Sequence, residues 1–598
     1  MNSFNLVKDP WIKAIDFDSN TRTVSILELL KNADKFWGLA NDIQIQDLSI
    51  LRLLLAILTT IYSRVNAEGK PYAWLTLDDQ MRVTHVEKEK FKISELLKTW
   101  KELKEKGDFN PAIEDYLNRN QEEFNFFGSK PFYQVSRAIY EKYMAEYEAT
   151  KKKKSKKVKK KTTRRKKEKT ADVTIKQLNR LISESNNSSN PFSPKTTTLK
   201  NDMPLDQLIR WTITYQNFTG TADKVKLDER SASRGWTYGS ASTYIKGKNL
   251  FETLIYNLIL VNDLSWNDPH NVNYSLQDPI WEQEYEKWIK KRRQEDLSKE
   301  LAHVPQNIAE LYTVQSRLLY IDWSTGKPSI FTIAMPKLNN IAAYQEPMTT
   351  WRKDKKGNYV PIYQSWRKDK KGNYVQSKNT MNRAIWRTFG NLVPTNSKDS
   401  GPKLGALNWI RRLREWKSLS SEERVNLISI YLISDGQSDN GPIGQVVDNM
   451  QINADVLFDS NPAKADSWPG LIEDMVEVTQ DCVQKYSNLI WHTEKFRHRS
   501  SSSSQDASSI ANRFVEEMYD LLNQPFNDWL GSLSNDEDRN AKVEIWEKNL
   551  YSLLLTEVKS YARSLTPRDI LASTNQDGSS FYKRYNFFKY YIRKKLLL

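Results

Sequence analysis

The sequence predicts an α+β protein, with a large irregular α/β N-terminal domain followed by a C-terminal antiparallel four-helix bundle. Two observations favour this class: short extended segments alternate with apolar helical segments early in the chain, and four long helical patterns follow residue 465. A chain of 598 residues is too long for one core. We expect domains over 1–450 and 451–598, with a disordered basic insertion at 140–172.

The N-terminal part opens with short extended segments, FNLV and IKAIDF, which predict a small sheet. Residues 42–62 are apolar almost all round, the pattern of a helix enclosed by a domain. Its most apolar stretch, Leu48–Tyr62, contains Arg52 and is shorter than the roughly 20 residues that a bilayer requires, and no apolar signal core precedes it. We therefore expect a cytoplasmic protein with no membrane contact. Further helical patterns lie at 92–105, 111–120, 205–217 and 247–261.

The net charge of +16 is concentrated in one segment. Residues 151–169 hold 14 basic residues and one acid, a local charge of +13, which leaves about +3 for the rest. Such a run repels itself and cannot form a core, so it predicts disorder. It can bind phosphates, but a solvated insertion with no partner is an equally good interpretation.

The decapeptide WRKDKKGNYV occurs twice, at 351–360 and 366–375. Each copy carries a Gly-Asn turn signal beside Tyr-Val, which predicts paired strands with basic tips. Residues 421–434 are helix or strand and lead into the turn-rich loop SDGQSDNGPIG.

The C-terminal part contains four long helical patterns separated by short polar connections. Such helices bury their apolar stripes most simply as an antiparallel bundle. The patterns cover 465–495, 507–530, 537–564 and 579–596.

Signatures of enzymes and metal sites are missing from the sequence. No phosphate-binding glycine loop, nucleophile elbow or HExxH motif occurs, and the five histidines are scattered without ligand spacing. Cys482 is the single cysteine, which excludes a cysteine-cluster metal site. The loop DGQSDNG lacks the glycine and glutamate that a calcium loop requires. We expect no cofactor, no metal and no small-molecule substrate.

Several segments together resemble a known family. FNLVKDPWI, DIQIQDLSILRLLLAIL, FFGSKPFYQV, GKNLFETLIYNLI, EPMTTWRK and RAIWRTFGNLV occur in the order seen in the CasA family. That family is the large subunit of Cascade, the type I-E CRISPR surveillance complex. The resemblance spans nearly the whole chain and implies the same plan, an α/β domain followed by a four-helix bundle. Some relatives carry a cysteine-rich metal site, which one cysteine cannot provide.

The resemblance implies DNA-binding residues in four loops. A long loop matches residues 186–204, and a glycine loop matches 219–222. A groove lysine falls in WRKDKKG, where the repeat leaves the choice of copy open, and a strand-separating wedge matches SDGQSDNG. The candidate residues are Phe192, Lys195, Thr219, Gly220, Thr221, Lys353, Lys355, Gln437 and Asn440.

The implied function is non-catalytic. The resemblance suggests a subunit that recognises the protospacer-adjacent motif in double-stranded DNA, starts strand separation, and helps recruit a helicase–nuclease. Its partners would be the target DNA, the subunits that hold the CRISPR RNA, and that nuclease. One alternative is a protein-interaction scaffold with an incidental basic insertion, whose binding would depend little on salt. A phosphodiesterase using unidentified acids is a second alternative.

Overall fold

The computed structural model divides into two compact units. Unit 1 comprises Met1–Gln376, Leu404–Leu419 and Ile428–Val447, and unit 2 comprises Ser377–Lys403, Ser420–Leu427 and Asp448–Leu598. Unit 2 thus contains the predicted C-terminal domain and two earlier segments that the predicted boundary at 450 assigned elsewhere. The structure describes residues 3–155, 173–179, 181, 195–196, 199–220, 225–227, 234–238, 240–261, 274–294, 305–336, 346–353, 359–361, 366–368, 374–376, 384–395, 403–420, 423–434, 442–459, 467–497, 503–571 and 581–597.

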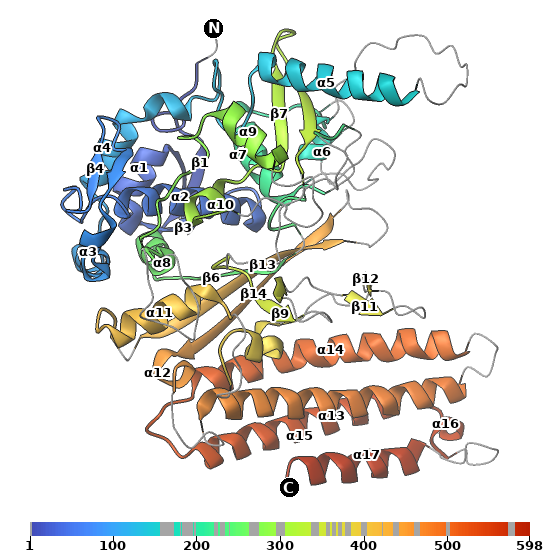
Figure 1. Ribbon diagram of the computed structural model, residues 1–598. Helices are drawn as coiled ribbons and strands as arrows, with labels where there is room; N and C mark the ends of the chain where they lie inside the picture. Colours follow the sequence, from blue (N-terminus) through green and yellow to red (C-terminus); the bar gives the residue numbers. More distant parts are fainter. Residues whose placement is uncertain are drawn as a thin grey trace. The chain divides into compact units, whose positions relative to one another are not determined.

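Unit 1 mixes helices with small antiparallel sheets (Figure 1). Its helices are α1 (Ile26–Lys31), α2 (Gln44–Tyr62), α3 (Ile93–Lys106), α4 (Ala112–Arg119), α5 (Arg137–Ser155), α6 (Ile175–Leu178), α7 (Leu205–Phe218), α8 (Leu250–Asn257), α9 (Tyr285–Gln294), α10 (Ile308–Thr313) and α11 (Gly405–Glu415). The mixture of helix and sheet confirms the predicted α+β class. The helices predicted near 42–62, 92–105, 111–120 and 205–217 are confirmed as α2, α3, α4 and α7, whereas α8 is shorter than its predicted range.

The strands form six separate small sheets among the described residues. They are β1 (Ile12–Asp16), β2 (Thr21–Val24), β3 (Phe36–Leu39), β4 (Leu75–Leu77), β5 (Val83–Val86), β6 (Ser242–Ile245), β7 (Arg317–Asp322), β8 (Ser329–Ala334), β9 (Trp351–Lys353), β10 (Tyr359–Pro361), β11 (Trp366–Lys368), β12 (Tyr374–Gln376), β13 (Arg424–Ser434) and β14 (Pro442–Asn453). The sheet orders are β2-β1-β3, β4-β5, β7-β8, β10-β9, β11-β12 and β14-β13-β6. Each copy of the repeat therefore forms its own antiparallel hairpin, as the turn signals predict.

Helix α2 lies in the core of unit 1. It is long and apolar enough to cross a membrane by composition, but 94% of its most apolar window is buried inside the protein. It packs against α7 and α10. The predicted all-round burial is confirmed, because polar side chains inside it are also enclosed and bond to nearby groups. Thr60, for example, donates to the Ala56 carbonyl at 2.7 Å.

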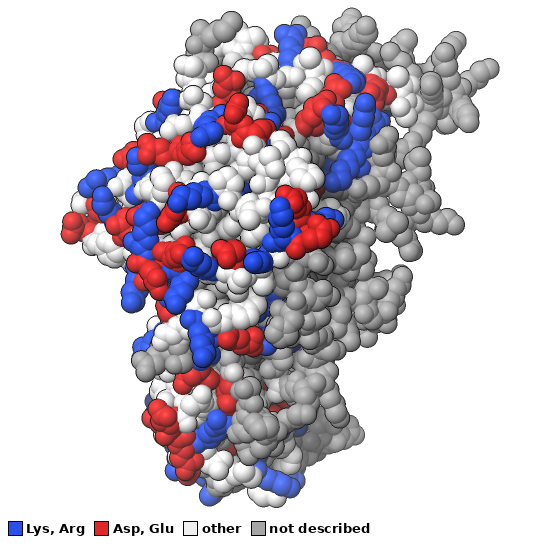
Figure 2. Space-filling model, turned by 60° about the vertical axis from the view of Figure 1, so that its left-hand side comes forward, with Lys and Arg blue, Asp and Glu red and all other residues white. Residues whose placement is uncertain are grey.

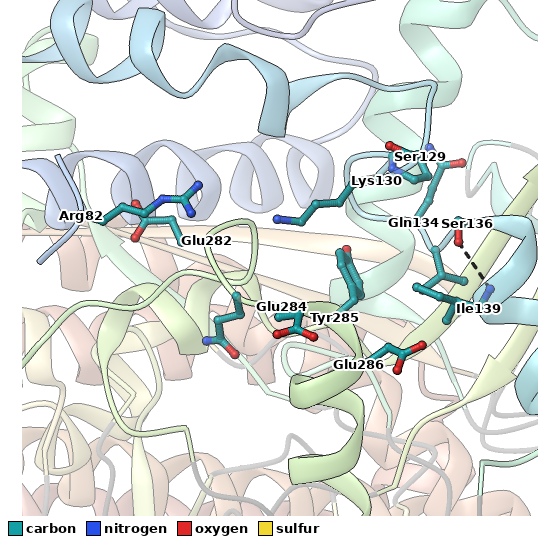
Figure 3. Close-up of a pocket in the computed structure, with 13 residues that line it drawn as sticks. Arg82, Ser129, Lys130, Gln134, Ser136, Ile139, Glu282, Glu284, Tyr285 and Glu286 are labelled. Carbon is teal, nitrogen blue, oxygen red and sulfur yellow. Dashed lines mark hydrogen bonds between the residues drawn. The ribbon is translucent and has the colours of Figure 1, made fainter. Parts of the chain in front are cut away.

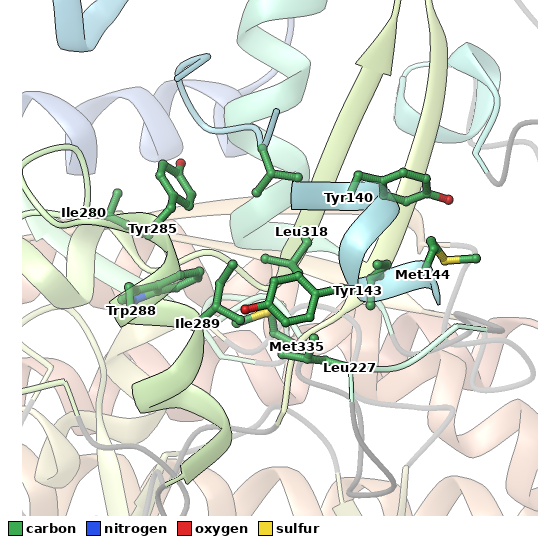
Figure 4. Packing of buried hydrophobic residues seen from close by; sticks show 12 residues of the cluster. Tyr140, Tyr143, Met144, Leu227, Ile280, Tyr285, Trp288, Ile289, Leu318 and Met335 are labelled. Carbon is green, nitrogen blue, oxygen red and sulfur yellow. The ribbon is translucent and has the colours of Figure 1, made fainter. Parts of the chain in front are cut away.

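A second apolar cluster joins α5, β7 and α9 (Figure 4). Tyr140 and Tyr143 of α5 pack there with Trp288 and Leu318.

The structure differs from the predicted disordered insertion at 140–172 over its first part, because α5 continues as helix through Ser155. The first turns of α5 are held in the core by Tyr140, Tyr143 and Met144, and the helix continues from them into the basic segment. Residues 156–172 lie outside the described residues.

Unit 2 contains four long helices, each near its predicted range: α13 (Trp468–Arg497), α14 (Ser503–Gly531), α15 (Arg539–Arg563) and α17 (Phe581–Lys595). Helix α13 contacts the other three. The shorter helices are α12 (Ala454–Leu457) and α16 (Pro567–Leu571). At the centre, Trp546 meets Phe526 edge-on at 4.7 Å between ring centroids and donates to Thr479 at 3.0 Å.

The segment over Ile385–Asn391, a 3₁₀ helix, completes this core. The Trp386 ring stacks on Phe526 with a centroid distance of 4.1 Å. The Gly390 amide donates to Glu473 of α13 at 2.7 Å. An aromatic side chain buried against the long helices explains why 377–403 belongs to unit 2.

Asp47, in the first turn of α2, gives the stability of unit 1 a specific pH dependence. Burial raises its pKa to about 6, although hydrogen bonds from Asn41 oppose that shift. The folded chain therefore holds this proton more tightly than the unfolded chain, and the stabilisation is lost as pH rises from about 4 to about 6.

We expect Asp47→Asn, which mimics the neutral carboxyl, to gain stability relative to the parent chain by up to about 3 kcal/mol between pH 4 and pH 7. Urea unfolding of both chains across this range measures the difference. Asp16→Asn is the matched control: the Asn20 amide lowers the pKa of Asp16, so its difference should stay flat there. A flat Asp47→Asn difference would contradict the assignment.

Candidate nucleic-acid interface

Strand β6 connects two of the sequence-predicted segments. On one edge it pairs with β13, in the order β14-β13-β6, and the hydroxyl of Thr243 donates to Ser429 of β13 at 3.1 Å. On the other edge the Thr243 amide donates to the Met348 carbonyl at 2.7 Å, and Ser242 forms a bridge with Thr349. The strands that lead to SDGQSDNG and the segment that leads to the first repeat copy therefore lie on either side of one strand.

The segment before the first repeat copy is fixed by a buried ion pair. Arg52 of α2 donates to the Glu346 carboxylate at 2.6 Å, and both side chains are fully buried. The second carboxylate oxygen accepts from the Thr349 hydroxyl at 2.5 Å. The Arg52 guanidinium also lies 4.4 Å from the Tyr312 ring centroid. Strand β9, which ends at Lys353, thus begins two residues after a segment that is held by the core.

The two-stranded ribbon formed by β13 and β14 also contacts the core helix α2, near the start of β14. The Gln445 side chain of β14 accepts from the Ile45 amide at 3.2 Å and donates to the Gln44 side chain. These contacts satisfy a free amide in the first turn of α2, which the hydrophobic N-cap Ile43 cannot do. The ribbon is therefore fixed to the core helix four residues after residue 441, where the segment 435–441 outside the described residues ends.

The glycine loop has a closed base. The Gly235 amide donates to the Thr219 carbonyl at 2.9 Å, and Thr237 donates to the Asn217 carbonyl through both its amide and its hydroxyl. Arg317 of β7 donates to the Gly220 carbonyl. Seven residues after Gly235 the chain enters β6, so the glycine loop connects to the same strand.

Gln216 holds the positions around this base. Its side-chain oxygen accepts from the Ser316 and Arg317 amides, each at 3.0 Å, and its nitrogen donates to the Arg317 carbonyl at 3.0 Å. Sequence reasoning missed Gln216, Arg317 and Gly235. The available signal was Gln216 and Arg317 inside apolar segments, because a buried polar side chain needs partners.

The structure places some of the predicted DNA-binding residues and not others. Thr219 and Gly220 are buried, and their carbonyls accept hydrogen bonds from other residues of unit 1. Both residues therefore have a structural role at the base of the loop. Lys195 donates to the Asp202 carbonyl at 2.8 Å, a bond within the described part of residues 186–204. Lys353 ends β9, where only the backbone is described. Outside the described residues lie Phe192, Thr221, Lys355, Gln437 and Asn440.

A cavity of about 360 Å³ in unit 1 is lined by several charged side chains (Figure 3). Its charged lining groups are already paired: Arg82 and Lys130 both contact Glu123, at 2.9 and 2.6 Å. Glu282 forms a buried pair with Arg64 at 2.7 Å. The described residues hold no His, Cys, Asp and Glu cluster that could bind a metal.

The described surface carries mixed charge. On the face in Figure 2, lysine and arginine side chains are interspersed with aspartate and glutamate. This agrees with the near-balanced charge of the sequence outside the basic run. This face is therefore not uniformly basic.

Comparisons with known proteins give the family. The model for the CRISPR-associated protein Cse1 matches residues 5–556. A match over this length places the chain among the CRISPR-associated proteins. It belongs to the Cse1 family, and since the Thermus thermophilus protein is titled CasA (Cse1), the resemblance found in the sequence is confirmed. No curated protein sequence matches the chain.

Solved structures share the fold across the whole chain. The Thermobifida fusca Cse1 structure aligns with a TM-score of 0.67 and 17% identity, covering 100% of this chain and 98% of that one. A Thermus thermophilus CasA structure aligns with a TM-score of 0.63 and 17% identity, covering 100% of this chain and 99% of that one. A chain of a structure titled CRISPR RNA-guided surveillance complex aligns with a TM-score of 0.62 and 12% identity, covering 100% of both chains.

The closed base of the glycine loop leads to a prediction about Gly235. A Cβ at this position would lie 2.1 Å from the Asn217 carbonyl oxygen, which is far inside contact distance. We expect Gly235→Ala to break the bonds that join residues 217–219 to residues 235–237. This should destabilise unit 1 by about 1–3 kcal/mol. Faster amide exchange over 217–237 than in the parent chain would measure the opening.

Gly38→Ala provides the matched control, because nothing lies within 4 Å of a Cβ there. It should leave exchange over 217–237 unchanged. Equal exchange in the Gly235→Ala variant and the parent chain would contradict the closed base.

Proposed function

We propose that this protein is the large, non-catalytic subunit of a CRISPR RNA-guided surveillance complex of the Cascade type. The observation that carries the proposal is the Cse1 family match over residues 5–556. The alignment with a chain of a surveillance complex over its full length supports it. In this role the chain recognises the protospacer-adjacent motif in double-stranded DNA, starts strand separation for an R-loop, and helps recruit a helicase–nuclease.

The anchored loops support recognition by a few side chains. Three of the four candidate segments connect to β6 or to the core of unit 1: through the buried Arg52–Glu346 pair, the part-buried Gln445 contact with α2, and the Thr219–Gly235 bond. Segments whose flanking residues are already fixed by folding lose less entropy when they bind. In the proposed site, Lys353 or Lys355 donates in the minor groove and Gln437 with Asn440 enters the base stack.

The remaining candidate residues have supporting parts in this proposal. Thr219 and Gly220 hold the loop that presents Thr221, and Lys195 with Phe192 contacts the backbone of the DNA or the neighbouring subunits. The four long helices of unit 2 act as a bundle that docks partners and takes no part in chemistry. The type I-E assignment and a cytoplasmic location belong to the same proposal.

The wedge assignment predicts a specific defect. We expect Gln437→Ala combined with Asn440→Ala to slow strand opening at least about 10-fold in the assembled complex, since unstacking costs a few kcal/mol per step. Initial duplex binding should change less. Fluorescence of 2-aminopurine at the first target pair measures opening, and an electrophoretic shift measures binding.

A target with mismatched first pairs should restore opening, because the wedge is then unnecessary. Ser434→Ala combined with Ser438→Ala, in the same segment, is the matched control and should behave as the parent complex. A double amide variant that fails equally on the mismatched target would exclude the wedge.

The repeat offers an internal control for the groove lysine. We expect Lys353→Ala with Lys355→Ala to weaken binding to a motif-bearing duplex about 5- to 100-fold at moderate salt, because Lys in a groove adds about 1–3 kcal/mol of contact energy. The same change in the second copy, Lys368→Ala with Lys370→Ala, should cost less. The reverse order would assign the groove to the second copy. Titration against a randomised flanking library gives both values.

A further inference from the structure

A groove of about 340 Å³ lies between α13 and α17, within unit 2. Basic and aromatic side chains share its lining. Those that the argument uses are Lys485, His492, Lys583, Arg584, Phe587 and Tyr591. The volume is within the range of about 300–1,000 Å³ that is typical of ligand sites.

The two walls are regular helix faces. Lys485 and His492 are seven residues apart on α13, which places them on one side of that helix. Arg584, Phe587 and Tyr591 have the spacing i, i+3 and i+7 on α17, and so they too form one stripe. The groove therefore has cations on both walls, and its phenylalanine and tyrosine rings lie on the α17 wall.

The composition of α17 is unusual for a helix that only covers a core. Of its 15 residues, seven are aromatic, six are basic and none is acidic. Phe581, Phe588 and Ile592 are buried and hold the helix in unit 2, while Lys595 pairs with Asp481 of α13 at 2.9 Å. The family match ends at residue 556, so α17 lies beyond it.

One ring of the groove, that of Phe587, is accessible. Phe587 is 64% exposed, and the Lys485 ammonium lies 4.5 Å from the Tyr591 ring centroid. Tyr582 and Tyr590 on the same helix are also exposed. Exposed aromatic area beside cations indicates an interaction surface, because hydration of such area is unfavourable.

We propose that this groove binds single-stranded nucleic acid. Phosphates contact Lys485, Lys583 and Arg584, and a base stacks on Phe587. Stacking rings inside a cationic channel are the chemistry that binds unpaired strands irrespective of sequence. An acidic peptide would use the cations but leave the rings exposed. Reading of a duplex motif by unit 1 does not require this site, so the inference goes beyond the proposed function.

The test uses the full chain without guide RNA or duplex. A labelled oligothymidylate of about 15 nucleotides is titrated and its anisotropy followed. We expect Phe587→Ala to weaken binding about 5- to 100-fold, as loss of one stacked base does. Tyr590→Ala, an equally exposed aromatic on α17 outside the groove lining, should change affinity less than about twofold.

The charge contribution is measured by salt dependence. Lys485→Gln with Lys583→Gln should reduce the slope of log affinity against log salt by about 1.4, which corresponds to two phosphates on a single strand. Lys589→Gln with Lys594→Gln removes the same charge from α17 outside the groove lining and should reduce it less. Equal slopes for the two double variants would overturn the proposal.

Cross-linking separates this groove from the basic run at 151–169. An oligonucleotide with 5-iodouracil should cross-link to peptides that contain Phe587 or Tyr591. Cross-links that fall solely outside α13 and α17, or equal affinity of the Phe587→Ala and Tyr590→Ala variants, would refute the site. An oligoglutamate of matched charge should compete poorly; competition as strong as that of the oligonucleotide would instead indicate an acidic peptide.

Discussion

Unit 1 depends on the enclosure of α2. A helix that is buried on all sides gains a large apolar contribution, but a charged side chain in it, or a free amide of its first turn, needs a partner from another part of the chain. Arg52 finds Glu346, which is almost three hundred residues later, and the first turn finds Gln445. Because an unpaired buried guanidinium would cost several kcal/mol, these distant segments are held wherever α2 places them.

This constraint gives the candidate interface a rigid base. The segments that accept the polar groups of α2 are the ones that continue into β9 and the β13–β14 ribbon, and β6 joins them. The glycine loop adds a third anchor through Gln216 and Arg317. Residues at the ends of these segments can therefore differ between proteins while the anchored parts stay the same. This is consistent with a fold shared with the Thermobifida fusca Cse1 structure at 17% identity.

The sequence predicted elements whose pattern is local. The apolar run of α2, the turn signals of the repeat and the four long helices of unit 2 all depend on residues close in the chain, and their positions are confirmed within a few residues. Prediction from the sequence failed for residues whose contact partner is distant in the chain. Thr219 and Gly220 were predicted to contact DNA, because no pattern in the neighbouring sequence indicates that their carbonyls accept hydrogen bonds from Gly235 and Arg317. Trp386 likewise gave no sign that its ring stacks on Phe526 in unit 2.

The same reasoning distinguishes the two copies of an identical decapeptide. Local sequence gives both copies the same hairpin, so their chemistry cannot differ in isolation. The root of the first copy is anchored: β9 follows Glu346 and Thr349, whose side chains are bonded to each other, and Glu346 also pairs with Arg52. A lysine on an anchored strand loses its ordering entropy during folding, whereas one on a less restrained strand must lose that freedom when it binds. The anchored root of β9, and not residue type, is therefore the ground on which we propose the first copy for the groove contact.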